Sequence, residues 1–201
     1  MFERWTGRHS AEERSDVELH REALTGSGDA MAALYRRHGS LVYRFTLRMS
    51  GDASIAEEVT QEVFLALLRQ IARFDPQRAS LGTWLCAIAR RQLWKHLGGL
   101  SEYKPEEDEA ESAEIECPGD SPVTSLIRRE AVEAVRLGVE ELPARFKEVI
   151  VLCEFEEMSY EQVALILEIP VGTVRSRLHR AKARLARTLC ADAVGRGGER
   201  Q

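Results

Sequence analysis

Apolar residues recur three or four positions apart along most of this sequence, with polar residues between them. This spacing predicts amphipathic helices, because every third or fourth residue of an α-helix lies on the same face. In the first half it predicts one helix over residues 31–47, a second over 55–71 and a third that ends at residue 97. No alternating pattern typical of a β-strand lies between them. The predicted fold class is therefore all-α.

Residues that start and stop helices separate these three segments. Gly39 is a candidate soft break in the first helix, and Gly51 ends it. Pro76 follows the second helix, which we expect to pack antiparallel to the first; proline lacks a backbone N–H group, and the residue before it avoids helical angles. Either Ser80 or Thr83 would cap the third helix. The first half is thus a small helical domain.

Acidic residues dominate residues 101–122, where prolines interrupt the chain and Lys104 is the single cation. Such a composition is typical of a flexible linker between two folded domains. The predicted organisation is an N-terminal extension (1–28), a helical domain (29–98), an acidic linker (99–124), a second helical domain (125–191) and a tail (192–201).

The second half predicts two further helices, one on each side of Pro143, followed by a helix-turn-helix. Ser159 with Gln162 three residues later resembles a capping box that opens a short helix. A turn at residues 168–169 leads to Pro170, whose fixed backbone angle suits the start of a new helix. Helix, tight turn and helix therefore follow one another directly.

The last helix has an apolar face and a basic face. Its apolar positions are Val174, Leu178, Ala181 and Leu185, and its cations are Arg175, Arg177, Arg180, Lys182, Arg184 and Arg187. No acidic residue occurs between Ile169 and Ala191. A solvated cationic surface would have the same composition, but a recognition helix presents its first residues to bases and uses flanking cations on phosphates. We therefore interpret this helix as a DNA-binding element.

The orientation expected for that helix divides its residues into two groups. Thr173, Ser176 and Arg180 are predicted to lie opposite the apolar face and to enter the major groove. Three arginines that flank this line are predicted to contact phosphates instead: Arg175, Arg177 and Arg184. Base reading and positioning would then be separable functions of one helix.

Composition and charge limit the classes of function. Of 201 residues 44% are hydrophobic and 30% are charged, which is typical of a folded protein. The net charge of −5 implies that any contact with nucleic acid is local rather than spread over the surface. No apolar run approaches the roughly 20 residues that span a bilayer, and the first residues have no apolar core typical of a secretory signal. We expect a cytoplasmic protein without membrane contact of its own.

The reactive residue types form no pattern typical of catalysis or metal binding. The four cysteines are scattered without a CxxC pair, and the histidines have no ligand spacing around them. Cys117, in the acidic segment, is the candidate reactive thiol. A DNA-processing enzyme would need an activated nucleophile or rigidly held carboxylates. We expect no catalysis, no metal, no cofactor and no small-molecule substrate.

Two segments resemble a known family. The segment LPARFKEVIVLCEFEEMSYEQVALILEIPVGTVRSRLHRAKARL, residues 142–185, closely resembles region four of extracytoplasmic-function sigma factors, and residues 29–97 resemble region two, with AEEVTQEVFLALL similar to its polymerase-clamp helix. The resemblance implies a factor that binds core RNA polymerase, recognises the minus-thirty-five element and melts the minus-ten element of promoter DNA. It also implies regulation by an anti-sigma factor.

The resemblance assigns roles to three groups of residues. Polymerase contacts would be Glu58, Gln61, Glu62, Phe64 and Leu68, although the same residues also fit an ordinary polar helix face with Phe64 in the core. Minus-ten contacts would be Phe74, Asp75, Gln77, Arg78, Ser80, Arg90, Arg91 and Lys95; Trp84 is expected to pack in the core. Minus-thirty-five contacts would be Thr173, Arg175, Ser176, Arg177, His179, Arg180 and Arg184.

The minus-ten segment departs from the family pattern at two positions. Arg91 stands where the family usually has Asn after the IAR triplet, and Lys95 stands where it often has Asp. Both changes add positive charge, which favours contact with the phosphates of a separated strand and adds no base-reading amide.

Two alternative interpretations involve the same helices. A polymerase-independent regulator would use the helix-turn-helix alone, which leaves the first half of the chain without a function. An interaction module held by an antagonist is compatible with the sigma-factor interpretation, because an antagonist would cover the same faces.

Overall fold

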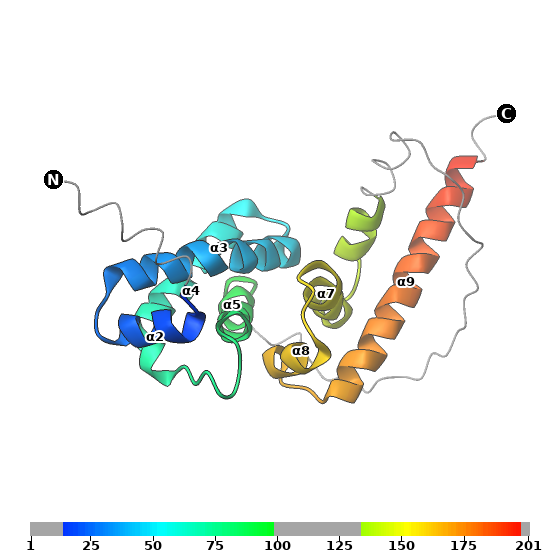
Figure 1. Ribbon diagram of the computed structural model, residues 1–201. Coiled ribbons are helices and arrows are strands. Elements are labelled where there is room, and N and C mark those ends of the chain that lie inside the picture. Colours follow the sequence, from blue (N-terminus) through cyan, green and yellow to red (C-terminus); the bar gives the residue numbers. More distant parts are fainter. Residues whose placement is uncertain (1–13, 99–133, 198–201) are drawn as a thin grey trace. The chain divides into compact units, whose positions relative to one another are not determined.

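The computed structural model of this chain describes residues 14–98 and 134–197, with side chains up to residue 189. Every regular element in these two ranges is a helix, as the apolar spacing predicts (Figure 1). The chain divides into two compact units, one mainly from residues 14–98 and the other mainly from 134–164 and 169–197. The predicted acidic linker, including Cys117, lies outside the described residues. No helix in the described part of the chain has the length and apolar character needed to cross a membrane.

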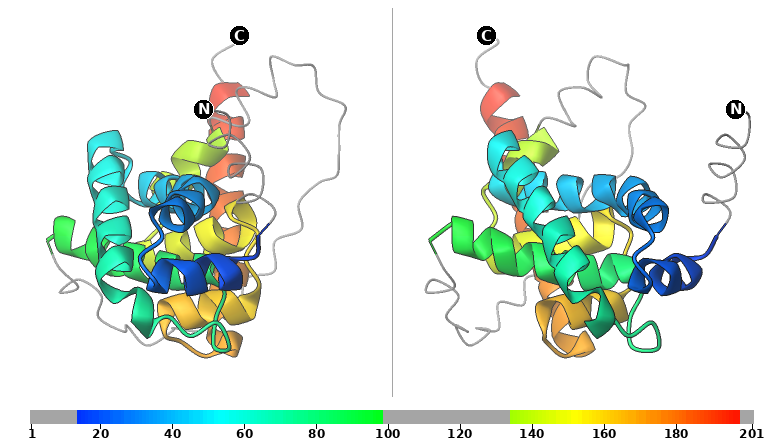
Figure 2. Two further views of the ribbon diagram at one scale, coloured as in Figure 1. Left: turned by 60° about the vertical axis from the view of Figure 1, so that its left-hand side comes forward. Right: turned by 90° about the vertical axis from the view of Figure 1, so that its left-hand side faces the viewer.

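The first unit is a bundle built around α3 (Gly28–Ser50). This helix contacts α2 (Asp16–Leu24), α4 (Ala53–Gln70) and α5 (Leu81–His96), and a single 3-10 turn, η1 (Ile71–Arg73), follows α4. Figure 2 shows α5 (green) crossing α4 (cyan to teal) in both views. The apolar side chains that meet between these helices form the core: Leu19, Leu34, Val42, Phe45, Val59, Val63, Leu67, Leu81, Leu85 and Leu93.

The helix boundaries in this unit follow local signals in the sequence. Gly51 adopts the left-handed conformation (φ 72°) that ends α3, and its N–H donates to the carbonyl of Leu47. Ser80, one of the two candidates, is the residue that caps α5, because its hydroxyl accepts from the N–H of Thr83. The soft break expected at Gly39 is wrong, since α3 continues through this buried glycine.

Helix α2 lies inside the segment that we predicted to be an N-terminal extension. Ser15 and Glu18 form a capping box at its start, and Leu19 is fully buried in the bundle. The Nε2 atom of His20 lies 2.9 Å from the carbonyl oxygen of Ile71, so the helix also contacts the turn after α4. Residues 14–27 are therefore part of the first unit.

A polar cluster fastens the start of α2 to α3. One carboxylate oxygen of Asp16 lies 2.6 Å from an Nη atom of Arg37, and the other lies 2.9 Å from Nε2 of His38. Arg37 also donates to the carbonyl of Arg14. The hydrogen bond with His38 lowers the pKa of Asp16 below its ordinary value, burial opposes this shift, and Arg37 adds to it. The cluster is thus strongest while Asp16 is ionised.

Asp16→Asn should destabilise the first unit by about 1.5 to 3 kcal/mol at neutral pH, the usual contribution of a hydrogen bond to a charged group. Because the folded pKa is lowered, the contribution is fully present above the ordinary pKa of aspartate and is lost as the pH falls through the lower folded value. Urea unfolding followed by tryptophan fluorescence at pH 7 and pH 3 measures this. Asp29→Asn, at an exposed carboxylate of the same unit, is the control. Equal effects of Asp16→Asn at both pH values would contradict the assignment.

The second unit ends in a helix-turn-helix. Residues 134–140 are helical and are followed by α7 (Ala144–Ile150), the π-helical turn η3 (Val151–Phe155), α8 (Tyr160–Leu167) and α9 (Val171–Gly197). Helix α7 packs along α9. Between α8 and α9, Glu168 turns the chain with a φ of 58°.

The sequence signals predicted for this half are present, but α9 begins one residue later than expected. Ser159 and Gln162 form the capping box of α8: the N–H of Ser159 donates to Oε1 of Gln162 at 2.9 Å, and the N–H of Gln162 donates to the hydroxyl of Ser159 at 3.3 Å. Pro170 stands one residue before α9, which we expected it to begin, and Pro143 stands directly before α7. Their missing N–H groups cost no helical hydrogen bond at those positions.

Candidate nucleic-acid and protein interfaces

The buried face of α9 matches the apolar stripe in the sequence. Val174, Leu178 and Ala181 are buried, and Leu185 is half-buried. On the opposite side Arg175 and His179 are exposed, and Ser176, half-buried, lies between them along the chain. The hydroxyl of Ser176 donates to the carbonyl of Thr173 at 3.1 Å and keeps its lone pairs for another donor. The outward surface of α9, defined here as Arg175, Ser176 and His179, is thus polar and basic.

Arg177 does not lie on that surface. Only 7% of this residue is exposed, so it packs on the buried side of α9 with Val174 and Leu178. The prediction that it flanks the groove as a phosphate contact does not fit this burial, because a phosphate must reach the guanidinium. The sequence misled us because a long arginine stem can cover apolar surface from a position beside the stripe.

Arg184 is half-buried over an aromatic ring. Its guanidinium carbon lies 4.9 Å from the centroid of Phe146, and that of Arg145 lies 5.0 Å from the same ring. Phe146 is 1% exposed and belongs to α7, so these contacts join α7 to α9. Arg180 and Thr173 are also half-buried, which makes His179 and Arg175 the more accessible side chains near the start of α9.

Two further cations of α9 have partners on the preceding elements. Arg175 lies 5.9 Å from the ring centroid of Tyr160, and Nζ of Lys182 lies 2.9 Å from Oε1 of Glu154. The hydrogen bond to Glu154 raises the pKa of Lys182. The ion pair with Glu154 joins α9 to the element before α8, and Arg175 remains exposed beside Tyr160.

In the first unit most residues of the loop between η1 and α5 are polar and exposed, whereas its first residue is buried. Asp75 accepts a hydrogen bond from the N–H of Gln77 at 2.9 Å, which closes a tight turn. Gln77, Arg78 and Ser80 are exposed. Phe74 is only 5% exposed, so it anchors the loop and is too buried to stack on a base in this conformation. The predicted direct contact of Phe74 with the minus-ten element does not fit this burial.

Aromatic packing explains the position of Phe74. Its ring lies edge-on to His20 with centroids 5.0 Å apart, and it lies 5.6 Å from Trp84. Trp84 therefore packs against the core, as we expected. Farther along α5, Arg91 and Lys95 are exposed and Arg90 is half-buried.

The outer face of α4 combines carboxylates with apolar side chains. Gln61 is exposed, Glu58 and Leu68 are more than half exposed, and Leu65 is 49% exposed. Phe64 is only 7% exposed and packs edge-on to Tyr35 with ring centroids 4.6 Å apart. Of the predicted polymerase contacts, Phe64 is thus buried beneath the outer face of α4, and the other four side chains are accessible to a partner.

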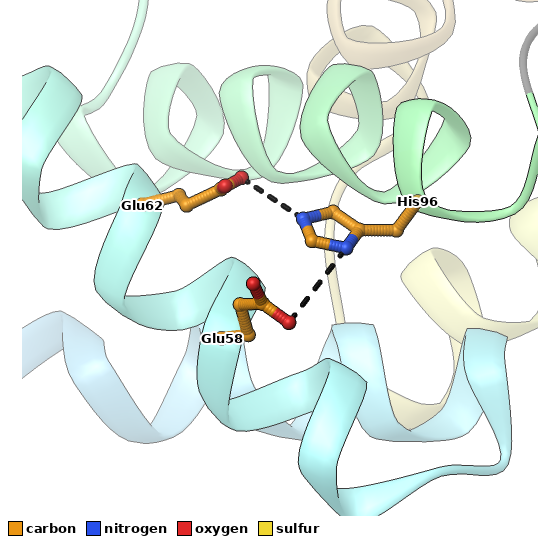
Figure 3. A group of neighbouring side chains, drawn as sticks. All are labelled: Glu58, Glu62 and His96. Atoms are coloured by element: carbon orange, nitrogen blue, oxygen red, sulfur yellow. Dashed lines mark hydrogen bonds and ion pairs between the residues drawn. The ribbon is translucent and has the colours of Figure 1, made fainter.

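Glu58 and Glu62 share one partner on α5. Nε2 of His96 lies 3.2 Å from Oε2 of Glu62, and Nδ1 lies 3.9 Å from Oε2 of Glu58, as Figure 3 shows. His96 is 34 or more positions from the two glutamates in the sequence. The pattern along α4 therefore did not indicate that a histidine lies beside them.

The two cysteines whose side chains are described have no signs of reactivity. Cys86 is buried, and burial raises the pKa of Cys153 to about 11. The Cys153 thiol is therefore protonated near neutral pH and is a poor nucleophile, and the Cys86 thiol is shielded from solvent by burial.

Comparison with known families matches both units. The family described as Sigma-70 region 2 matches residues 34–101, and the family described as Sigma-70, region 4 matches residues 132–185. The chain is 31% identical to the RNA polymerase sigma-H factor of Pseudomonas aeruginosa over 185 residues, which cover 88% of this chain and 95% of that protein. It is 32% identical to the ECF RNA polymerase sigma factor BldN of Streptomyces coelicolor over 181 residues, which cover 88% of this chain and 67% of that protein.

Solved structures share the fold. A structure of CnrH in complex with the cytosolic domain of CnrY matches with a TM-score of 0.66 at 23% identity, covering 89% of this chain and 99% of that one. The sigma factor RpoE of Bartonella quintana, in complex with the anti-sigma factor NepR, matches with a TM-score of 0.58 at 21% identity and covers 79% of this chain and 95% of that one. With both regions matched in order and relatives aligned along most of its length, this chain belongs to the extracytoplasmic-function group of the sigma-70 family.

Proposed function

We propose that this chain binds core RNA polymerase through the outer face of α4 and directs it to promoters through α9 and the loop before α5. The observation that carries this proposal is the exposed charge on these elements: α4 exposes Glu57 and Glu58 near its start, whereas α5 and the described side chains of α9 include exposed cations and no carboxylate. A basic surface of polymerase would attract the carboxylates, and DNA phosphates would bind the cations. The chain acts as a binding factor in the cytoplasm, and we assign no catalytic step to it.

In vitro transcription from a promoter library, with core polymerase alone and with polymerase plus this chain, tests the proposal. Initiation at a defined set of promoters only when the chain is present is the expected result. If the chain instead binds the same promoters without polymerase and leaves initiation unchanged, the polymerase-independent regulator becomes the correct description.

The same faces are the ones that an anti-sigma factor would cover. The RpoE structure was solved with an anti-sigma factor bound, and this chain has the same fold. We propose that an anti-sigma factor holds this chain inactive by occupying the outer face of α4 or the outward surface of α9. Competition between core polymerase and a candidate antagonist for the purified chain tests this step.

Base reading and phosphate contact should separate along the outward surface of α9. Ser176→Ala and His179→Ala should change the preference among minus-thirty-five sequences, with about 1 to 3 kcal/mol of discrimination lost where a good base contact is removed. Arg175→Ala should weaken binding to all promoters alike and lower the salt dependence by about one phosphate contact. Binding of the polymerase complex to a randomised upstream element at two salt concentrations measures both. A change of preference in Arg175→Ala alone would mean that the helix is oriented differently in the groove.

Arg177→Ala should destabilise the second unit by about 1 to 3 kcal/mol, because the change removes packed stem and a buried polar group. Arg175→Ala is the matched control, since this arginine is exposed, and its cost should stay within about 0.5 kcal/mol. Urea unfolding followed by far-ultraviolet circular dichroism measures both. An unchanged stability of Arg177→Ala with weaker DNA binding would restore a direct phosphate contact.

A further inference from the structure

Glu58, Glu62 and His96 bring three potential metal ligands together on the surface of the first unit (Figure 3). The two glutamates lie one turn apart on α4, and His96 is the last residue of α5. One ligand atom from each residue lies within 4.8 Å of the other two. The side chains are 65%, 38% and 22% exposed, in that order, so a small ion can reach them from solvent.

The charges of this cluster are incompletely balanced. Carboxylates at positions i and i+4 of a helix repel each other, and within the described part of the chain His96 is the only ion-pair partner of either. A neutral imidazole has one N–H group, so it donates to one carboxylate and turns a lone pair toward the other. Because Glu62 faces Nε2 and Glu58 faces Nδ1, a cation held by one ring nitrogen would bind both carboxylates only after the other glutamate turns toward it.

The donor set indicates which cation fits. Imidazole nitrogen with carboxylate oxygen suits zinc and neighbouring transition metals, whereas magnesium and calcium prefer oxygen ligands alone. Zinc bonds of about 2.0 to 2.1 Å place the ligands of a tetrahedron roughly 3.3 Å apart, so binding would draw together ligand atoms that now lie within 4.8 Å of one another and would reorient one glutamate side chain. We propose that Glu58, Glu62 and His96 form a binding site for a divalent transition-metal cation such as Zn²⁺, with water as the remaining ligand.

The site would compete with polymerase. Glu58 and Glu62 belong to the face that we propose for polymerase binding, and a bound cation would cancel their charge and cover their oxygens. This consequence rests on the proposed function, whereas binding of the cation itself does not. Transcription initiation that depends on this chain would then decrease when free transition metal is abundant.

Calorimetric titration of the full chain with Zn²⁺ tests the site directly. His96→Gln and Glu62→Gln should each weaken the affinity at least tenfold, while Glu57→Gln, which removes the same charge from an exposed neighbour on α4, should leave it within twofold. Circular dichroism establishes that the variants are folded. Absorption of the Co²⁺ complex separates this site from thiol ligation, because sulfur ligands add an intense charge-transfer band. The absence of saturable binding, or equal affinity of the wild type and His96→Gln, would overturn the proposal.

A second measurement separates the metal site from the polymerase contact. Saturating Zn²⁺ should weaken the binding of core polymerase to the wild-type chain and have no such effect on His96→Gln, which controls for zinc acting on polymerase itself. If zinc binds the wild type but polymerase affinity is unchanged, the competition is wrong and the site stands. If Zn²⁺ binding is intact and charge reversal at Glu58 and Glu62 leaves polymerase affinity unchanged, the proposed polymerase face fails instead.

Discussion

Replacing Phe146 by alanine should destabilise the second unit by about 3 to 5 kcal/mol, the usual cost of removing a buried aromatic side chain. This ring is 1% exposed, and it lies under the guanidinium groups of Arg145 and Arg184. Its loss would remove a central part of the packing between α7 and α9 that orients the helix proposed to read DNA. A unit of this size has a small free energy of unfolding, so the second unit should be unfolded in a large fraction of the molecules.

The distribution of tryptophans allows each unit to be followed separately. No tryptophan lies in the second half of the sequence, and Trp84 and Trp94 belong to α5, so their fluorescence reports on the first unit. Phe146→Ala should lower the helical signal in circular dichroism at low urea and leave the tryptophan transition in place. Phe155→Ala is the matched control, because this residue is 38% exposed and its truncation should cost much less. Equal losses in both variants would show that burial of Phe146 does not hold α9 in place.

Reversing the two carboxylates of α4, in Glu58→Lys with Glu62→Lys, should weaken binding of core polymerase by about 100-fold. Placing like charges opposite each other in an interface costs several kcal/mol, which corresponds to at least this factor. The helical content should not change, because lysine and glutamate have similar helix propensities and both positions face solvent in part. Fluorescence titration of labelled core polymerase at physiological salt measures the affinity.

The control must change the net charge by the same amount elsewhere. Glu141→Lys with Glu157→Lys does so at two exposed carboxylates of the second unit. This variant should bind polymerase through α4 as the wild type does. If both double variants lose affinity equally, the net charge of the chain matters more than the α4 face, and the specific contact is refuted.

Several elements could be predicted from the sequence because their causes are local. A cap such as Ser80 or Ser159 acts within three residues of its own position, and Gly51 ends α3 through its own backbone conformation. The apolar spacing of α9 likewise appears in the sequence, since Val174 and Leu178 are one turn apart. The all-helical class, the helix-turn-helix and the family resemblance follow from such short-range patterns.

The burial of individual site residues was decided by packing between distant segments. Phe74 is buried because His20 and Trp84 lie against it, and no spacing in the loop sequence records those contacts. Helix α2 was missed for the same reason, since a nine-residue helix is marginal alone and becomes stable where its buried face packs on α3.

Apart from α2, the sequence by itself determined which of the described segments are helical, where most of them begin and end, and which helix carries the cations. Only the tertiary structure decided that Arg177 packs inward and that His96 meets Glu58 and Glu62. The physical reason is range: capping and periodicity depend on neighbours within one or two turns, whereas burial and ion pairing depend on which helix faces meet once the chain has folded.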